Sequence, residues 1–83
     1  MAEYIHEIAG LVDSVVRPLI DFEEDLEITS REEDGVVIVE ISVNEEDAGK
    51  VIGRQGRVIK SVRTLARAAA SRKDMRVEVE ILD

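Results

Sequence analysis

The stretch VIGRQGR, residues 51–57, sets an Arg-Gln pair between two glycines, Gly53 and Gly56. Neither glycine carries a Cβ, so the main chain here can approach a ligand closely. The second glycine opens a predicted helix, whose free N–H groups and positive dipole end favour a phosphate. A glycine pair at this spacing is also an ordinary way to end one helix and start the next. The surrounding residues must therefore decide between a structural turn and a binding loop.

The charge along the chain is divided around this loop. Residues 48–73 hold eight basic side chains and no acidic one, whereas residues 1–47 hold 15 acidic and 2 basic side chains. Residues 74–83 are acidic again, and the formal net charge is −8. That net charge argues against a nonspecific nucleic-acid binder. The carboxylate-free segment 48–73, with the loop inside it, favours an anionic ligand at the loop.

Length and composition indicate a small globular protein. The 83 residues are 45% hydrophobic and 36% charged, which is typical of one soluble domain, spanning 1–83. There is no cysteine to form a disulfide or a thiolate metal site. No apolar run reaches the roughly 20 residues of a membrane span, and the N-terminus lacks the features of a signal peptide. We therefore expect a cytoplasmic domain.

The sequence contains no arrangement typical of catalysis or metal binding. The single histidine, His6, stands between Glu3 and Glu7, which is typical of a solvated helix face. Ser14, Ser61 and Ser71 have no base partner that would make them nucleophiles. We expect no enzymatic activity, no metal and no cofactor.

Hydrophobic spacing predicts a helix and a β-hairpin in the first half of the chain. Apolar residues recur at intervals of three and four over residues 3–17, which predicts a helix. The acidic residues 21–25 are expected to form a loop. Weak alternation predicts a strand over 26–31, and β-branched residues predict a central strand over 36–43. An Asp-Gly pair at 34–35 predicts the tight turn between these strands.

The second half predicts two helices and a last strand. Asn44 is expected to cap a short helix whose first turn holds residues 45–47, where carboxylates suit the positive dipole end. A longer helix is expected over 56–71, and clean alternation predicts a strand over 75–82. One side of the longer helix is expected to hold Val58, Ile59, Val62, Leu65, Ala66 and Ala69.

The order helix, strand, strand, helix, helix, strand predicts an α+β fold. The last strand follows the central one through two helices, a crossover that joins parallel neighbours and is right-handed. We expect a three-stranded mixed sheet with three helices on one face. The loop at 53–56 is not a P-loop, because the five-residue spacing and the Gly-Lys-Ser/Thr ending are absent. It also lacks the preceding strand and third glycine of the dinucleotide fingerprint.

Residues 51–59, VIGRQGRVI, resemble the signature of the KH domain, a module that binds RNA and single-stranded DNA. The element order resembles the type II, prokaryotic arrangement of that domain. Residues 16–20, 47–50 and 62–65 extend the similarity. Over its whole length the chain is similar to the small stand-alone bacterial KH proteins of the KhpA type. Residues 21–25 are more acidic than the resemblance to this family leads us to expect, which leaves the role of that loop open.

The resemblance implies a single-stranded RNA-binding protein that acts as an RNA chaperone or post-transcriptional regulator. The main chain of residues 53–56 would hold the sugar-phosphate backbone of about four nucleotides, with the bases in a groove too narrow for a duplex. Tyr4 and Phe22 are the only aromatic residues, so stacking platforms are not expected. The resemblance also implies self-association, or pairing with a second KH-containing protein of the Jag type. The residues expected at the RNA site are Gly49, Lys50, Val51, Ile52, Gly53, Arg54, Gln55, Gly56, Arg57, Ile59 and Lys60.

Two other functions compete with this interpretation. In a helix-turn-helix DNA-binding protein, the basic residues of the longer helix would enter a major groove. In a protein-interaction module, the glycine loop would be structural only. Arg63 and Arg67 either contact RNA or pair with nearby glutamates. Val36, Ile38 and Leu65 either pack in the ordinary way or contribute to a dimer.

Overall fold

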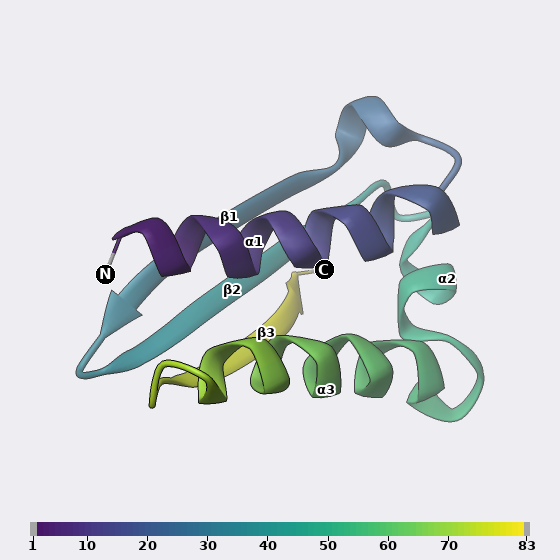
Figure 1. Cartoon of the computed structure of the whole chain (residues 1–83). Coiled ribbons are helices and arrows are strands. Elements are labelled where there is room, and N and C mark those ends of the chain that lie inside the picture. Colours follow the sequence, from purple (N-terminus) through teal and green to yellow (C-terminus); the bar gives the residue numbers. More distant parts are fainter. Residues whose placement is uncertain (1, 83) are drawn as a thin grey trace.

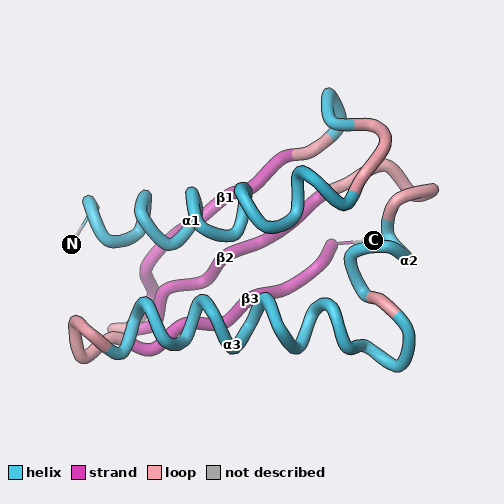
Figure 2. Tube along the Cα trace, turned by 45° about the vertical axis from the view of Figure 1, so that its right-hand side comes forward, coloured by secondary structure: helices cyan, strands magenta, loops and turns pink. Residues whose placement is uncertain are grey.

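Two long helices lie across one face of a three-stranded sheet in the computed structural model, which describes residues 2–82 (Figure 1). A short helix, α2, sits at one end of the helical layer beside the start of α3 (Figures 1 and 2). In chain order the elements are α1 (Ala2–Val16), β1 (Glu27–Glu33), β2 (Val36–Ser42), α2 (Ala48–Ile52), α3 (Arg57–Ser71) and β3 (Arg76–Leu82). Short 3-10 turns lie at Arg17–Leu19, Glu23–Asp25 and Arg54–Gly56.

The sheet has the predicted mixed topology. Its strand order is β1-β2-β3, with β1 antiparallel to β2 and β2 parallel to β3. The hairpin turn is Asp34-Gly35, with φ of 52° and 82°. Positive φ at both central residues matches the right-handed twist of the flanking strands. The predicted hairpin, central strand and parallel crossover are therefore confirmed.

The hydrophobic core lies between the helices and β2. Along β2 every second side chain faces this core, so strict alternation decides which face is buried. Along α3 the buried residues follow spacings of three and four. The buried hydrophobic residues are Ile8, Val12, Val16, Ile20, Val37, Val39, Ile41, Val51, Ile59, Val62, Ala66, Ala70, Val77 and Val79.

Leu65 does not share the buried side of α3, contrary to the expectation for this residue. Its side chain is 46% exposed. The buried stripe runs through Ile59, Val62, Ala66 and Ala70, and at about 100° per residue Leu65 lies roughly 100° from the middle of it. A prediction from hydrophobicity alone places the buried side of α3 too close to Leu65. This happens because leucine is more hydrophobic than the small alanines that are buried instead.

The segment before α2 also differs from its prediction. The helix begins at Ala48, and residues 45–47 form turns outside it. The Oδ1 atom of Asn44 accepts a hydrogen bond from the main-chain N–H of Glu46 at 2.9 Å. This is an Asx turn, which competes with helix capping for the same side chain. The prediction that Asn44 caps α2 was therefore wrong. Within the described residues, no helix combines the length and the apolar character needed to cross a bilayer.

Candidate nucleic-acid interface

The loop between α2 and α3, called the glycine loop here (residues 53–56), turns through two backbone conformations that favour glycine. Gly53 has φ 79° and ψ 170°, a region open almost only to glycine. Gln55 (φ 58°) and Gly56 (φ 74°) are left-handed. The N–H of Gly53 donates to the carbonyl of Gly49 at 2.8 Å, and the N–H of Gly56 donates to the carbonyl of Gly53 at 3.1 Å. These bonds hold the loop in a defined shape between the two helices.

The tip of the glycine loop presents polar side chains to solvent. Arg54 and Gln55 are both exposed. The Nη2 atom of Arg57 donates to Oε1 of Gln55 at 3.1 Å, which holds these two side chains together. Arg54 forms no ion pair within residues 2–82. The helix α3 starts here with no side-chain cap, and the N–H of Arg57 donates to the carbonyl of Arg54. The positive end of its dipole favours an anion at the loop.

The apolar residues beside the loop divide between the core and the surface. Val51 is fully buried and Ile59 is 6% exposed, so their side chains belong to the core. Ile52 is 38% exposed and supplies the apolar surface next to the loop. Gly49 is exposed, and a Cβ there would meet no atom within 4 Å. Of the apolar residues expected at the site, only Ile52 offers its side chain to a ligand.

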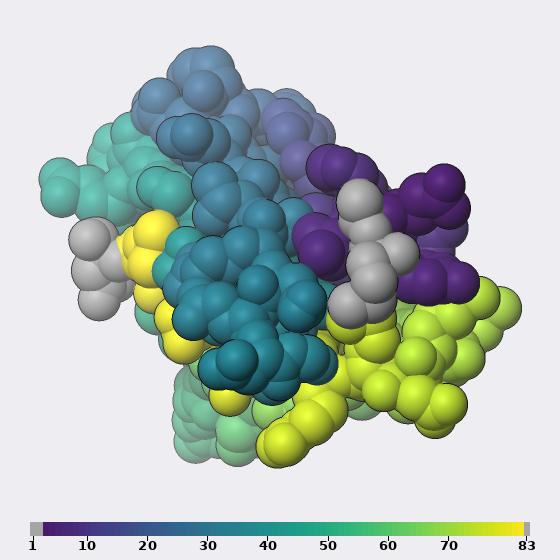
Figure 3. Space-filling view, turned by 90° about the vertical axis from the view of Figure 1, so that its left-hand side faces the viewer, coloured from purple at the N-terminus to yellow at the C-terminus, as the bar shows by residue number. Residues whose placement is uncertain are grey.

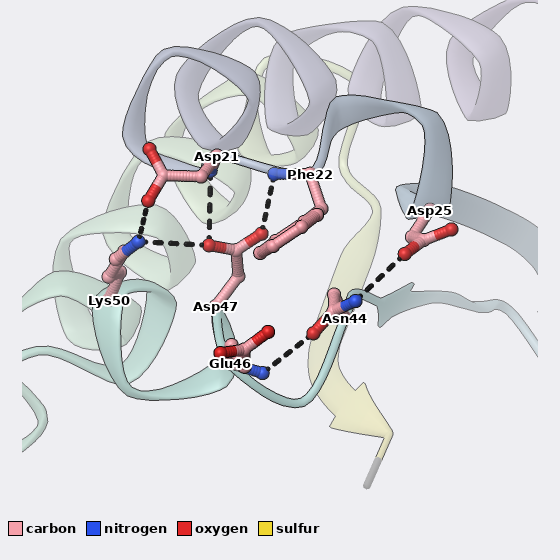
Figure 4. Close-up of polar contacts among 7 residues, drawn as sticks. All are labelled: Asp21, Phe22, Asp25, Asn44, Glu46, Asp47 and Lys50. Atoms are coloured by element: carbon pink, nitrogen blue, oxygen red, sulfur yellow. Dashed lines mark hydrogen bonds and ion pairs between the residues drawn. The ribbon is translucent and has the colours of Figure 1, made fainter.

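Lys50 forms ion pairs within the protein. Its ammonium group forms ion pairs with the carboxylates of Asp21 and Asp47, the latter at 3.1 Å (Figure 4). The hydrogen bond to Asp21, followed by that to Asp47, raises the pKa of Lys50. The structure therefore places Lys50 in a contact with the acidic segment, whereas Lys60 and Arg57 remain on the exposed surface of α3.

In this region the burial of the Asp47 side chain differs most from the prediction. Asp47 was expected in the first turn of a helix as a partner of the helix dipole, and instead it precedes α2 and its side chain is fully buried. It accepts hydrogen bonds from the main-chain N–H of Asp21 at 3.0 Å and of Phe22 at 2.9 Å (Figure 4). Burial alone would raise the pKa of Asp47, but these two donors and Lys50 together hold it below its ordinary value. The sequence held one signal for this burial: Asp47 stands four residues before Val51, a spacing that places two side chains on the same side where a helix begins.

A second surface runs from the loop along α3 and the edge of the sheet. Among the described residues the strand β3 pairs only with β2, so its other edge faces α3 and solvent. A crevice of about 230 Å³ lies between α3 and β3 and is lined by Arg63, Arg67, Glu78, Val79 and Glu80. Arg63 bridges the two elements, because its Nε donates to the carbonyl of Val79 at 3.1 Å. The strand β3 therefore forms one side of this crevice.

Arg63 and Arg67 are not paired with glutamates among the described residues. Of the two interpretations open for them, the structure removes the glutamate pairing within residues 2–82. Arg63 donates to the main chain of β3, and Arg67 is an exposed residue of α3.

Another hollow, of about 240 Å³, lies at the opposite end of the molecule from the glycine loop. The beginning of α1 and the end of α3 lie side by side there (Figure 3). Lys73 lies over the ring of Tyr4, with Nζ 4.5 Å from the ring centroid, a contact that joins α1 to the turn after α3. In residues 2–82, no three His, Cys, Asp or Glu side chains come close enough together to hold a metal ion.

A glycine-framed loop between two helices, backed by a three-stranded mixed sheet with a parallel crossover, defines a KH domain. The chain belongs to the KhpA/KhpB KH-domain family, whose model matches residues 9–81. This confirms the family expected from residues 51–59, and the family is not an enzyme family. The helix-turn-helix interpretation was wrong, because α3 packs against β3 as part of a KH fold.

Individual relatives agree with this assignment. The chain is 44% identical to the RNA-binding protein KhpA of Listeria monocytogenes over 73 residues, which cover 88% of this chain and 96% of that protein. It is 40% identical to the RNA-binding protein KhpA of Borreliella burgdorferi over 83 residues, the full length of both. The protein of the same name from Bacillus subtilis is 38% identical over 76 residues, 92% of this chain and 94% of that protein.

One solved structure shares the fold. A crystal structure of a variant of Era from Aquifex aeolicus, bound to GDP and aluminium fluoride, aligns with a TM-score of 0.64 and 22% identity. The alignment covers 90% of this chain and 29% of the longer Era chain. At this identity the likeness shows the fold alone.

Proposed function

We propose that this protein binds single-stranded RNA and that the main chain of the glycine loop holds the sugar-phosphate backbone. One observation carries the proposal: two glycines in glycine-only or left-handed conformations present Arg54, which forms no ion pair within residues 2–82, inside the carboxylate-free segment 48–73. The KhpA relatives are named RNA-binding proteins, which supports the same ligand. The protein would act as one KH domain.

The chemistry of the proposed site follows from its parts. A phosphate beside the loop would lie at the positive end of the α3 dipole. Arg54 and Arg57 add full positive charges there. Ile52 provides an apolar surface for a base, and the crevice between α3 and β3 leads bases toward Arg63 and Arg67. With no aromatic platform at the loop, affinity depends on phosphate contacts and falls with salt.

The biological role that we propose is that of an RNA chaperone or post-transcriptional regulator in the cytoplasm. A binder of short single strands with modest affinity can bind many transcripts and release them. We also propose that it acts as a homodimer or together with a second KH-containing protein of the Jag type. The pairing of KhpA and KhpB in the family description supports this association.

The RNA-binding proposal is tested by fluorescence anisotropy with a short labelled single-stranded RNA over a series of salt concentrations. The variant Arg54→Asp/Gln55→Asp places two carboxylates at the loop tip, where both side chains are exposed and folding should not suffer. Wild type should bind with a log–log salt slope of about −0.7 per contacted phosphate, and the variant should lose binding.

The control is Arg72→Asp/Lys73→Gln, which lowers the net charge by the same amount at the far end of α3 and should still bind. Equal binding by wild type and the loop variant would place the site elsewhere. If wild type binds neither RNA nor single-stranded DNA, the protein-interaction module becomes the better interpretation, and the search turns to a protein partner.

A further inference from the structure

The helix that leads into the glycine loop is too short to hold its own position. α2 has five residues, whereas isolated helices below about 12 residues are marginal in water. Its direction must therefore come from its contacts with the rest of the protein. Two fully buried side chains supply them, Val51 in the hydrophobic core and Asp47 at the start of the helix.

Asp47 starts α2 with its main chain and joins this helix to a distant part of the chain with its side chain. Its carbonyl accepts hydrogen bonds from the N–H groups of Lys50 at 3.0 Å and Val51 at 3.3 Å, which begin the helix. Its carboxylate does not cap α2 and instead accepts the N–H groups of Asp21 and Phe22. One residue therefore starts α2 and ties it to the acidic segment that follows α1 (Figure 4).

Lys50 strengthens the same connection. Its ammonium lies between the carboxylates of Asp21 and Asp47, one turn before the glycine loop. The positive charge of a lysine that contacts two carboxylates is already balanced. A phosphate that binds this lysine would have to displace one of the two carboxylates. Asp21 is exposed, and it gives the acidic loop a structural role as the outer half of this bridge.

We propose that Asp47 is a positioning residue for RNA binding, which sets the direction of α2 and hence the place of the glycine loop without contacting RNA itself. Lys50 belongs to this bridge and is not a phosphate ligand. The inference rests on the proposed function, since it concerns the geometry of that same loop.

Charge alone and positioning predict opposite outcomes when Asp47 is neutralised. Removing a carboxylate near a phosphate site lowers repulsion, so electrostatics predicts equal or tighter RNA binding. Positioning predicts weaker binding, because the side-chain amide introduced by Asp47→Asn sets an N–H donor against a main-chain N–H donor. The sign of the change therefore separates the two effects.

The test compares Asp47→Asn with Glu46→Gln, two adjacent residues with the same change of charge. Glu46 is exposed, and within residues 2–82 its side chain makes no hydrogen bond. Asp47→Asn should weaken RNA binding by about tenfold, the size expected for loss of one charged hydrogen bond, with the salt slope unchanged. In the free protein it should also shift the amide resonances of Gly53 and Gly56. Glu46→Gln should do neither.

A second pair of variants keeps the proposal testable if Asp47→Asn does not fold. Lys50→Met and Asp21→Asn leave the two main-chain hydrogen bonds to Asp47 in place, so both should fold. Each should weaken RNA binding severalfold at an unchanged salt slope. If Lys50→Met instead lowers the magnitude of the slope by about 0.7, Lys50 contacts a phosphate and the proposal is overturned.

The outcomes also separate this inference from the proposed function. If wild type binds RNA, and Asp47→Asn binds equally well with unmoved Gly53 and Gly56 resonances, positioning by Asp47 is wrong and RNA binding stands. If wild type does not bind RNA, the proposed function is wrong. The resonances of the two glycines then decide by themselves whether Asp47 sets the loop.

Discussion

A Cβ at Gly53 would lie 2.8 Å from the main-chain nitrogen of Val58, closer than real Cβ contacts come. The glycine also has φ 79° and ψ 170°, which other residues rarely adopt. Gly53→Ala should therefore lower the free energy of unfolding by about 1–3 kcal/mol from backbone strain alone, with the clash in addition. Urea unfolding followed by circular dichroism measures this loss.

Gly56 provides the comparison for that prediction. Its φ of 74° is also left-handed, but a Cβ there would meet no atom closer than 4.0 Å. Gly56→Ala should cost about 1–2 kcal/mol, the ordinary penalty for a left-handed residue. A Gly53 variant no more destabilised than the Gly56 variant would show that the contact with Val58 relaxes freely.

A substitution at Gly49 should change protein stability and RNA affinity in opposite directions. It lies in α2 with open space around its Cα, so Gly49→Ala should raise the free energy of unfolding by about 0.5–1 kcal/mol through helix propensity. The added methyl group covers exposed surface beside the loop and should weaken RNA binding. Stability from urea unfolding and affinity from anisotropy should move in opposite directions.

The matched variant is Gly10→Ala, in the exposed surface of α1 with equally open space. It should bring a similar gain in stability, because the helix propensity difference is the same. RNA affinity should not change, since Gly10 lies away from the loop. A loss of affinity here would mean that the Gly49 result reflects stiffening of the protein and not a covered surface.

Acid should destabilise the protein through Asp47. The main-chain donors and Lys50 hold its pKa in the folded protein below the ordinary value, despite burial. In the unfolded chain the pKa is about 3.9, so the unfolded state takes up the proton first as pH falls. The contribution of Asp47 is therefore complete well above pH 4, and it declines as pH falls through the folded pKa.

Melting temperatures measured between pH 7 and pH 3 check this dependence. Wild type should lose melting temperature on acidification, and Asp47→Asn should start lower and show a flatter profile. Glu46→Gln should follow wild type, since that side chain is exposed. Parallel profiles for wild type and Asp47→Asn would contradict the assigned shift.

Arg63 and Arg67 should differ in what they stabilise. Arg63→Met removes the hydrogen bond to the carbonyl of Val79 and should cost about 0.5–1.5 kcal/mol of stability. Arg67→Met removes an exposed side chain with no ion pair among residues 2–82 and should leave stability unchanged. If RNA follows the crevice between α3 and β3, both variants should weaken binding. Unchanged affinity in both would confine the interface to the glycine loop.

Local chemistry explains why much of the fold was predictable. Asp34-Gly35 predicts a tight hairpin because its residues tolerate positive φ, and the structure has positive φ at both. The β-branched alternation along 36–43 predicts a strand buried on one face, as observed in β2. Two helices between β2 and β3 predict parallel pairing, because a two-residue turn cannot make that connection. Each of these features depends on neighbours in the sequence.

The errors lie where neighbours in space compete with neighbours in sequence. Asn44 carries the residue type of a helix cap, but its Oδ1 closes a turn with the N–H of Glu46. Leu65 is a large apolar side chain of α3, yet packing against the rest of the core selected the side that holds Ala66 and Ala70. Small residues let helix and sheet approach closely, and hydrophobicity by itself does not report that.

The sequence by itself determined the order of the elements, the mixed sheet, the family and the glycine loop, because periodicity, turn chemistry and a contiguous motif are local properties. Only the tertiary structure decided that Asp47 is buried, that Lys50 is held by Asp21, and that β3 forms one side of the crevice beside α3. Asp47 and Phe22 are 25 residues apart in the chain. A carboxylate is buried only where donors from elsewhere in the chain satisfy it, and no local pattern specifies those donors.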